Sequence, residues 1–296
     1  MTGRFLPILV VVAPILATIA SIGCGSSTTT AASSAASWET QSTPVSYVVV
    51  CDVTRSTLWE RDEYLSGLGR VLDGVSYGDH IVVMSAEDSS VENSDMWIEE
   101  SVPRYSFSPS PRPDTDNQLL LDSWQKKQEE LYRKGLDEFA ATHDLTTWRS
   151  DALAGVKDRL MSGAANGSDL AGALYLAGQL LGDSSGKEDR RLVLFTDGLI
   201  QTPDVDWRSG KVTAGDVTRL VKRQRNAGSL PDLTGVSVTL IGARADDERL
   251  LPGLRNAWSK YVASCGGSLD PRFFMSHLSE TLYADWMEQP SDRAGG

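Results

Sequence analysis

A short apolar run that ends in an acidic residue places the strongest constraint on the fold of this chain. Residues 47–51 read Y-V-V-V-C, and Asp52 follows directly. A run of this length, rich in β-branched residues and bounded by polar ones, predicts a strand that is buried on both faces of a sheet. Asp52 then lies at the carboxyl end of that strand, which is the edge where open α/β sheets bind their ligands.

Two hydroxyl-bearing residues follow Asp52 at alternate positions. They are Thr54 and Ser56, so the loop reads D-V-T-R-S. A carboxylate and two hydroxyls at this spacing can direct three oxygen atoms toward one point. Because hard cations such as Mg²⁺ prefer ligands that are all oxygen, the loop is a candidate metal site.

Two further motifs occur later in the chain. Residues 166–174 read N-G-S-D-L-A-G-A-L, a turn that carries Ser168 and opens a predicted helix. Residues 192–198 read L-V-L-F-T-D-G, a predicted strand followed by Asp197. With the loop after the first strand, these motifs resemble the metal-ion-dependent adhesion site (MIDAS) of von Willebrand factor A (VWA) domains. Ser168 stands where that family usually has Thr.

The resemblance implies a set of ligands and a mode of binding. In the family, oxygens from the three motifs hold a divalent cation, and an acidic side chain of a protein partner fills an open coordination position. The residues that match are Asp52, Thr54, Ser56, Ser168 and Asp197. The resemblance therefore implies Mg²⁺, or Mn²⁺ or Ca²⁺, as cofactor and a partner that presents Asp or Glu.

The same residues also have an interpretation without metal. Asp52 could cap the following helix, Thr54 and Ser56 could satisfy turn amides, and Asp197 with its glycine could form only a turn. Beside the metal site we therefore keep a second hypothesis, a metal-independent structural scaffold in an envelope complex.

The alternation of strand-like and helix-like segments predicts an α/β fold. We expect a doubly wound, mostly parallel sheet of the VWA or Rossmann-like type, with one antiparallel edge strand and helices on both faces. The expected strands are residues 47–51, 80–85, 96–102 (the antiparallel edge), 192–195, 236–241 and 273–275. The expected helices are residues 58–72, 117–160, 170–181, 213–227, 247–264 and 278–287.

The first 23 residues differ from the rest of the chain. Arg4 precedes an almost wholly apolar stretch over residues 5–22, and small residues lead to Cys24. This arrangement predicts a lipoprotein signal peptide over residues 1–23, with cleavage before Cys24 and lipidation of its thiol. An ordinary signal peptide and an uncleaved anchor helix are the alternatives. Each of them places the folded part outside the cytoplasm, in a bacterial cell envelope, and the lipid would anchor it to a membrane.

Composition divides the remaining chain into segments. Residues 24–44 are rich in Ser, Thr and Ala and predict a flexible tether. Residues 45–290 would form the VWA-like domain, and residues 291–296 a disordered tail. A helical insertion around residues 106–150 is longer than such a domain needs. Its segment 117–144 is either a partner-binding excursion near the metal face or ordinary family helices, elongated, that pack on the sheet.

Charge and cysteine content limit the partners and the chemistry. The formal charge is −12, and removal of residues 1–23 leaves 27 basic and 40 acidic side chains, or −13. Phosphate repels so acidic a domain, so we expect no nucleic-acid partner. Cys51 and Cys265 would remain after cleavage. We expect two buried thiols, with a disulfide as the alternative.

Catalysis is not expected. The segment around Asp52 faintly resembles the opening of haloacid-dehalogenase phosphatases, and Asp246 with Asp247 could imitate their late acidic pair. However, Thr54 stands where that family needs a second Asp as general acid. The three histidines, His80, His143 and His277, form no pattern with a nucleophile or with zinc ligands. Trp207, in a loop after Asp197, is expected in the core, with an interface anchor beside the metal as the alternative.

Overall fold

A computed structural model describes residues 43–87, 90–163, 165, 167–182, 188–202, 205–207, 211–245, 247–276 and 285. The predicted signal peptide, the predicted lipidation site Cys24, most of the tether and the predicted tail lie outside the described residues. The predicted helix over residues 278–287 also lies outside them, apart from Asp285. No helix in the described part of the chain is long and apolar enough to span a membrane.

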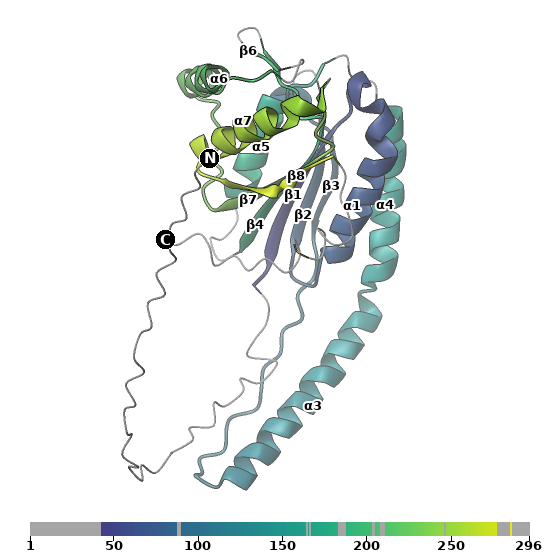
Figure 1. Cartoon of the computed structure of the whole chain (residues 1–296). Helices are drawn as coiled ribbons and strands as arrows, with labels where there is room; N and C mark the ends of the chain where they lie inside the picture. The colour runs from purple at the N-terminus through teal and green to yellow at the C-terminus, as the bar shows by residue number, and fades with distance from the viewer. Residues whose placement is uncertain are drawn as a thin grey trace, which may run out of the picture. The chain divides into compact units, whose positions relative to one another are not determined.

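A six-stranded sheet forms the centre of the domain (Figure 1). Its strand order is β3-β2-β1-β4-β7-β8, and every strand runs parallel to its neighbours except β3, which pairs antiparallel with β2 at one edge. This sheet confirms the predicted fold class. The strands are β1 Val45–Asp52, β2 His80–Ala86, β3 Met96–Ser101, β4 Asp189–Phe195, β7 Val236–Ile241 and β8 Ser268–Met275, with a small separate hairpin of β5 Gln201–Thr202 and β6 Val205–Asp206.

Helices connect the strands. The α-helices are α1 Arg61–Gly74, α2 Ser90–Asn93, α3 Gln118–Thr142, α4 Leu145–Ser162, α5 Leu170–Gly182, α6 Ala214–Ala227 and α7 Leu251–Ser264. Two short 3₁₀ helices, η1 Arg55–Glu60 and η2 Glu248–Leu250, lead into α1 and α7.

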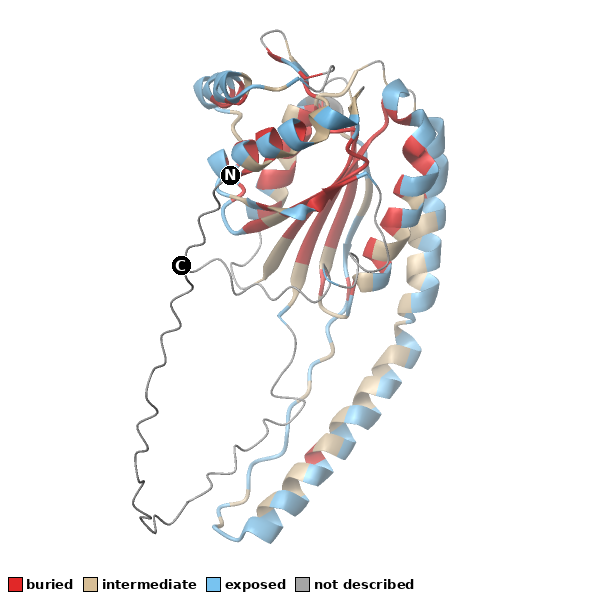
Figure 2. Cartoon of the chain, in the orientation of Figure 1, coloured by how far each residue is buried: buried red, intermediate tan, exposed pale blue. Residues whose placement is uncertain are grey.

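The alternation of side chains along β1 gives the sheet a core on each face (Figure 2). Val48 and Val50 belong to a core that also contains residues of α5 and α7. Tyr47, Val49 and Cys51 belong to a second core, with residues of α1 and α4. Because successive side chains of a strand point to opposite faces, an unbroken apolar run is what a doubly covered central strand requires.

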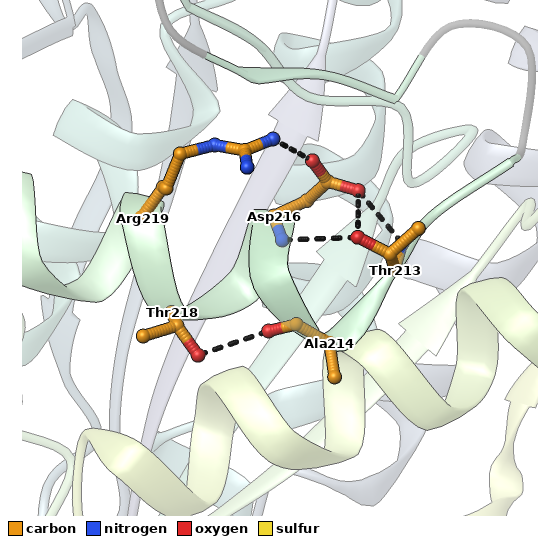
Figure 3. Close-up of polar contacts among 5 residues, drawn as sticks. All are labelled: Thr213, Ala214, Asp216, Thr218 and Arg219. Atoms are coloured by element: carbon orange, nitrogen blue, oxygen red, sulfur yellow. Dashed lines mark hydrogen bonds and ion pairs between the residues drawn. The ribbon is translucent and has the colours of Figure 1, made fainter.

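Helix α6 begins where the sequence predicts it because a capping box closes its first turn (Figure 3). The Thr213 side chain accepts a hydrogen bond from Asp216 N at 3.2 Å, and the Asp216 carboxylate accepts one from Thr213 N at 2.7 Å. Arg219 pairs with the other Asp216 oxygen, and the Thr218 hydroxyl donates to Ala214 O at 2.9 Å. The first two of these bonds satisfy amides that the helix start would otherwise leave without partners.

Both cysteines and Trp207 lie in the core. Cys51 and Cys265 are buried and free, which confirms the expectation of two buried thiols. Burial raises the pKa of Cys265 to about 12, so this thiol stays protonated at neutral pH. Trp207 is fully buried, and its ring meets that of Trp258 edge-on with centroids 6.0 Å apart. The core interpretation of Trp207 is confirmed, and the alternative of an interface anchor is wrong.

The insertion folds as an arm, by which we mean residues 103–144. Its extended first half packs along α3, where Ser110 N donates to the Gln128 side chain at 2.9 Å. The ring of Tyr105 lies 5.6 Å from the rings of both Tyr132 and Phe139. An aromatic row on one side of α3 therefore holds the two halves of the arm together.

The base of the arm lies at the amino-terminal edge of the parallel strands. Ser101, the last residue of β3, pairs with His80, the first residue of β2. At the other end of the arm, the hydroxyl of Tyr77 donates to His143 O at 2.7 Å. The carboxyl end of β1, with Asp52, is at the opposite edge. The interpretation of residues 117–144 as an excursion near the metal face is therefore wrong, because the antiparallel β3 carries the chain away from that edge.

Candidate metal site

Asp52 ends β1 with both carboxylate oxygens in hydrogen bonds to hydroxyls. Thr54 donates to Oδ1 from its backbone N–H at 3.0 Å and from its hydroxyl at 2.7 Å. The hydroxyl of Thr196, which follows β4, donates to Oδ2 at 3.0 Å. Asp52 and Thr196 are buried, so these bonds orient the carboxylate away from bulk water.

The chain of contacts continues from Thr54 to Asp197. The hydroxyl oxygens of Thr54 and Ser56 lie 3.0 Å apart. The Ser56 hydroxyl in turn interacts with the Asp197 carboxyl group, at the end of the neighbouring strand β4, and lowers its pKa. Four of the five predicted residues, Asp52, Thr54, Ser56 and Asp197, are thus linked side chain to side chain at the carboxyl edge of the sheet.

The pKa values of both carboxyl groups are raised. Burial raises the pKa of Asp52, against the opposing effect of hydrogen bonds from Thr54 and Thr196 and of the nearby Arg61 charge. Burial and the charge of Asp52 together raise the pKa of Asp197 to about 6. Two carboxylates close together in a buried site favour uptake of positive charge, either as a proton or as a cation.

The hydroxyl contacts also favour the binding of a cation. Thr54 donates its only hydroxyl proton to Asp52, and Ser56 contacts both Thr54 and Asp197. If Ser56 donates to Asp197, lone pairs of Thr54 and Ser56 face each other. If Ser56 donates to Thr54, its contact with Asp197 needs a proton on that carboxyl group. A cation among these oxygens would satisfy all of them at once, so the residues fit an oxygen-coordinated ion.

Ser168 comes to the site from a different segment. Ala165, just before it, forms a parallel bridge with Thr54. Just after it, Asp169 N donates to Glu87 O at 2.8 Å. This turn therefore lies between the ends of β1 and β2.

The Ser168 hydroxyl is buried and has no hydrogen-bond partner among the described residues. A buried hydroxyl without a partner is costly, and a bound cation would supply one. The structure thus places Ser168 in the segment beside the four linked residues, but no hydrogen bond joins it to them in the described part of the chain.

Arg61 and Thr196 belong to the site but were not among the predicted residues. Arg61 is buried and donates to Val53 O at 2.8 Å, to Thr54 O at 3.2 Å and to Met161 O at 3.1 Å. It therefore holds the backbone of the loop behind the hydroxyls. Thr196 was visible in the T-D-G motif as the residue before Asp197. Arg61 gave no such signal, because an arginine in the first turn of a helix is usually exposed.

The interpretation without metal accounts for only part of this geometry. Asp197 accepts a hydrogen bond from Leu199 N at 2.9 Å, as an ordinary turn would require. Thr54, however, is the N-cap residue of η1 and makes no side-chain capping bond, and Asp52 caps no helix. Of the two acidic residues that could imitate the late pair of a phosphatase, Asp246 lies outside the described residues. Asp247 pairs with Arg249 and accepts from its backbone N–H at 3.0 Å.

No group of three or more His, Cys, Asp or Glu side chains that could hold a metal occurs within the described ranges. Only two of the five predicted ligands are carboxylates, and the other three are hydroxyls. Coordination here would depend on the hydroxyls of Thr54, Ser56 and Ser168.

No protein-family profile matches the sequence, and no curated protein matches it either. Solved structures do resemble the chain. One is a von Willebrand factor type A structure from Catenulispora acidiphila, with 13% identity and a TM-score of 0.43 over 84% of this chain and 42% of that one. This chain thus spans less than half of that protein's length.

Two other similar structures come from pilus proteins. The vWF domain of the type V pili tip protein Mfa5 from Porphyromonas gingivalis is 9% identical, with a TM-score of 0.43 over 84% of this chain and 95% of that one. The pilus adhesin SpaC from Lactobacillus rhamnosus GG is 10% identical, with a TM-score of 0.43 over 86% of this chain and 30% of that one. Because all three TM-scores are below 0.5, we base the functional proposal on this chain's own sheet and side chains.

Proposed function

We propose that this chain is an extracytoplasmic, lipid-anchored, VWA-like binding module that docks a protein partner through a divalent cation. The observation that carries the proposal is the side-chain linkage of Asp52, Thr54, Ser56 and Asp197 at the carboxyl edge of the sheet. These residues come from two of the three sequence motifs, Ser168 of the third motif lies in the neighbouring segment, and their hydroxyls and carboxylates fit Mg²⁺ or a similar ion.

The residues would have different roles in such a site. Asp52 and Asp197 would provide negative charge, while Thr54, Ser56 and Ser168 would provide neutral oxygens. Thr196 and Arg61 would hold the carboxylate and the loop in position through the bonds described above. When bound, a divalent ion would supply positive charge, and an Asp or Glu of a partner would bind it at an open coordination position.

Calorimetry of the full chain in detergent tests the metal. We expect Mg²⁺ to bind and EDTA to reverse the binding, whereas Asp52→Ala should abolish it. Glu130→Gln, an exposed change on α3, is the matched control and should bind Mg²⁺ like the wild type. Absence of Mg²⁺ binding by the wild type would overturn the proposal.

The partner and the anchor need separate tests. Capture of envelope proteins from a detergent extract should depend on Mg²⁺ and be lost in Asp52→Ala. Labelling with a fatty acid should mark the wild-type chain and fail in Cys24→Ser, which should also release the protein from membranes. Equal labelling of the two chains would contradict lipidation at Cys24.

A metal-independent scaffold is the second candidate, and exposed leucines on the arm favour it. Leu119, Leu120 and Leu131 of α3 are 79%, 55% and 47% exposed. If they form the contact surface, changing all three to Ser will abolish partner capture while Asp52→Ala will not. Our proposal assigns no catalysis to the chain. Turnover of a phosphomonoester that Asp52→Asn abolishes would contradict that assignment.

A further inference from the structure

The 3₁₀ helix η1 carries exposed apolar residues directly beside the candidate metal site. A 3₁₀ helix has three residues per turn, so side chains at positions i and i+3 lie one above the other. Thr57 and Glu60 form the buried row of η1. Ser56, whose hydroxyl contacts Thr54 and Asp197, therefore shares its row with Trp59, one turn away.

The apolar side chains of η1 are unusually exposed. Trp59 is 88% exposed, and Leu58, in the adjoining row, is 46% exposed. By contrast, Trp207 and Trp258 are fully buried in the core. Exposed tryptophan is common where proteins bind each other, since a large, rigid side chain gains much when a partner covers it. One turn of a 3₁₀ helix rises about 6 Å. If a residue of the partner binds at the metal site, the next residue of that partner is therefore within reach of Trp59.

The backbone beneath Trp59 is fixed to the site. The Thr57 hydroxyl donates to Asp52 O at 2.9 Å and lies 3.0 Å from Thr54 O. At the end of η1, the Glu60 carboxylate pairs with Arg244, whose backbone N–H donates to Asp197 O at 3.0 Å. The backbone of η1 is therefore tied at Thr57 and Glu60 to segments that carry the predicted ligands, which fixes the backbone of Trp59 relative to them.

The charge around the row is mixed. Arg55 is exposed at the start of η1, whereas Arg244 at its end pairs with Glu60, and the exposed Asp62 and Glu63 follow in α1. A preference for an acidic partner would therefore come from the cation at the metal site, to which Arg55 adds positive charge.

We propose that Trp59, with Leu58, forms an apolar docking surface that selects partner segments in which a carboxylate lies next to a large aliphatic or aromatic side chain. This inference rests on the proposed function, because the carboxylate would bind at the metal site. The apolar neighbour would pack on Trp59. A lone carboxylate would satisfy the cation but would leave this surface exposed to water.

Selection from a random peptide library tests the inference. The full chain in detergent is immobilised with Mg²⁺, and bound peptides are eluted with EDTA. We expect the eluted sequences to carry Asp or Glu with a large apolar residue within about two positions, because an extended peptide advances about 3.3 Å per residue. Their dissociation constants should rise at least about tenfold for Trp59→Ala and less for Trp59→Phe. Met96→Ala, a truncation of a 38% exposed apolar side chain on the edge strand β3, is the control and should bind them like the wild type.

The outcomes separate this inference from the proposed function. Failure of the wild type to bind Mg²⁺ in calorimetry would overturn the metal site itself. If the wild type binds Mg²⁺ but the eluted peptides bind Trp59→Ala as tightly as they bind the wild type, or no peptide is eluted by EDTA, the inference about Trp59 is wrong. Calorimetry of Trp59→Ala with Mg²⁺ shows that a loss of peptide binding does not reflect a damaged ion site.

Discussion

The hydroxyl of Thr196 donates a hydrogen bond to Oδ2 of Asp52 at 3.0 Å, which joins the ends of β4 and β1 across 144 residues of sequence. The same hydroxyl accepts from Gly198 N at 3.1 Å. One buried side chain therefore orients a predicted metal ligand and also satisfies the turn that carries Asp197, another predicted ligand.

Replacing Thr196 by Val keeps the shape of the side chain and removes both bonds. Mg²⁺ affinity should fall by about 10- to 100-fold, because the Asp52 carboxylate loses the donor that orients it. The free energy of unfolding should fall by about 1–3 kcal/mol, since Gly198 N–H is left buried without an acceptor. Calorimetry and urea unfolding measure the two effects. Thr196→Ser keeps the hydroxyl and should lie close to the wild type in both, and equal losses in the two variants would contradict this role.

Asp197 should destabilise the metal-free protein at neutral pH. Its pKa rises from 3.8 to about 6 in the folded state, mainly through burial and then through the charge of Asp52. The folded state therefore holds this proton more tightly than the unfolded state does. The stability it contributes is fully present below pH 3.8 and is lost as the pH rises through about 6.

Asp197→Asn should remove this penalty and also remove metal binding. In EDTA at a pH of about 7.5 we expect the variant to be more stable than the wild type by about 1–3 kcal/mol, with the difference disappearing below a pH of about 4. With Mg²⁺ the order should reverse, because only the wild type gains from the ion. Urea unfolding at both pH values, with EDTA and with Mg²⁺, gives the comparison. A variant less stable than the wild type in EDTA at the higher pH would show that Asp197 is satisfied without a cation.

Ser168 offers a test of the one predicted ligand that makes no hydrogen bond to the others among the described residues. Ser168→Ala removes a buried hydroxyl that has no partner there. Stability in EDTA should therefore stay within about 1 kcal/mol of the wild type, while Mg²⁺ affinity falls at least about tenfold. Ser168→Thr restores the more usual residue and adds a methyl group that stiffens the side chain, so its affinity should equal or exceed that of the wild type. Unchanged affinity in Ser168→Ala would remove this residue from the ligand set.

The sequence predicted the centre of the fold and most of the candidate site for related physical reasons. An apolar run with no alternation is typical of a strand covered on both faces, and residues 47–51 are such a run. Parallel strands end at one edge, so the residues after residues 47–51 and after residues 192–195 had to meet. That is why Asp52 and Asp197 could be placed together from sequence, although they are far apart in the chain.

Other features depended on contacts that no local pattern contains. The helix expected from residue 58 begins as the 3₁₀ helix η1 at Arg55, because the Thr57 hydroxyl bonds back to the end of β1. The burial of Arg61 depends on carbonyl groups of two other segments. The position of the arm depends on the direction of β3. The amino-acid composition of the arm suits either edge of the sheet, so it could not indicate which one.

Arg61 joins two segments, because its three carbonyl acceptors come from the loop after β1 and from the end of α4. Arg61→Met fills a similar volume but leaves these groups without a donor. We expect a loss of about 3 kcal/mol or more in the free energy of unfolding and weaker Mg²⁺ binding in the folded fraction. Arg249→Met, which breaks an exposed pair with Asp247, should cost less than about 1 kcal/mol and leave the ion site unchanged. Similar losses from the two variants would mean that the loop keeps its shape through the hydroxyl bonds of Thr54 and Thr57 alone.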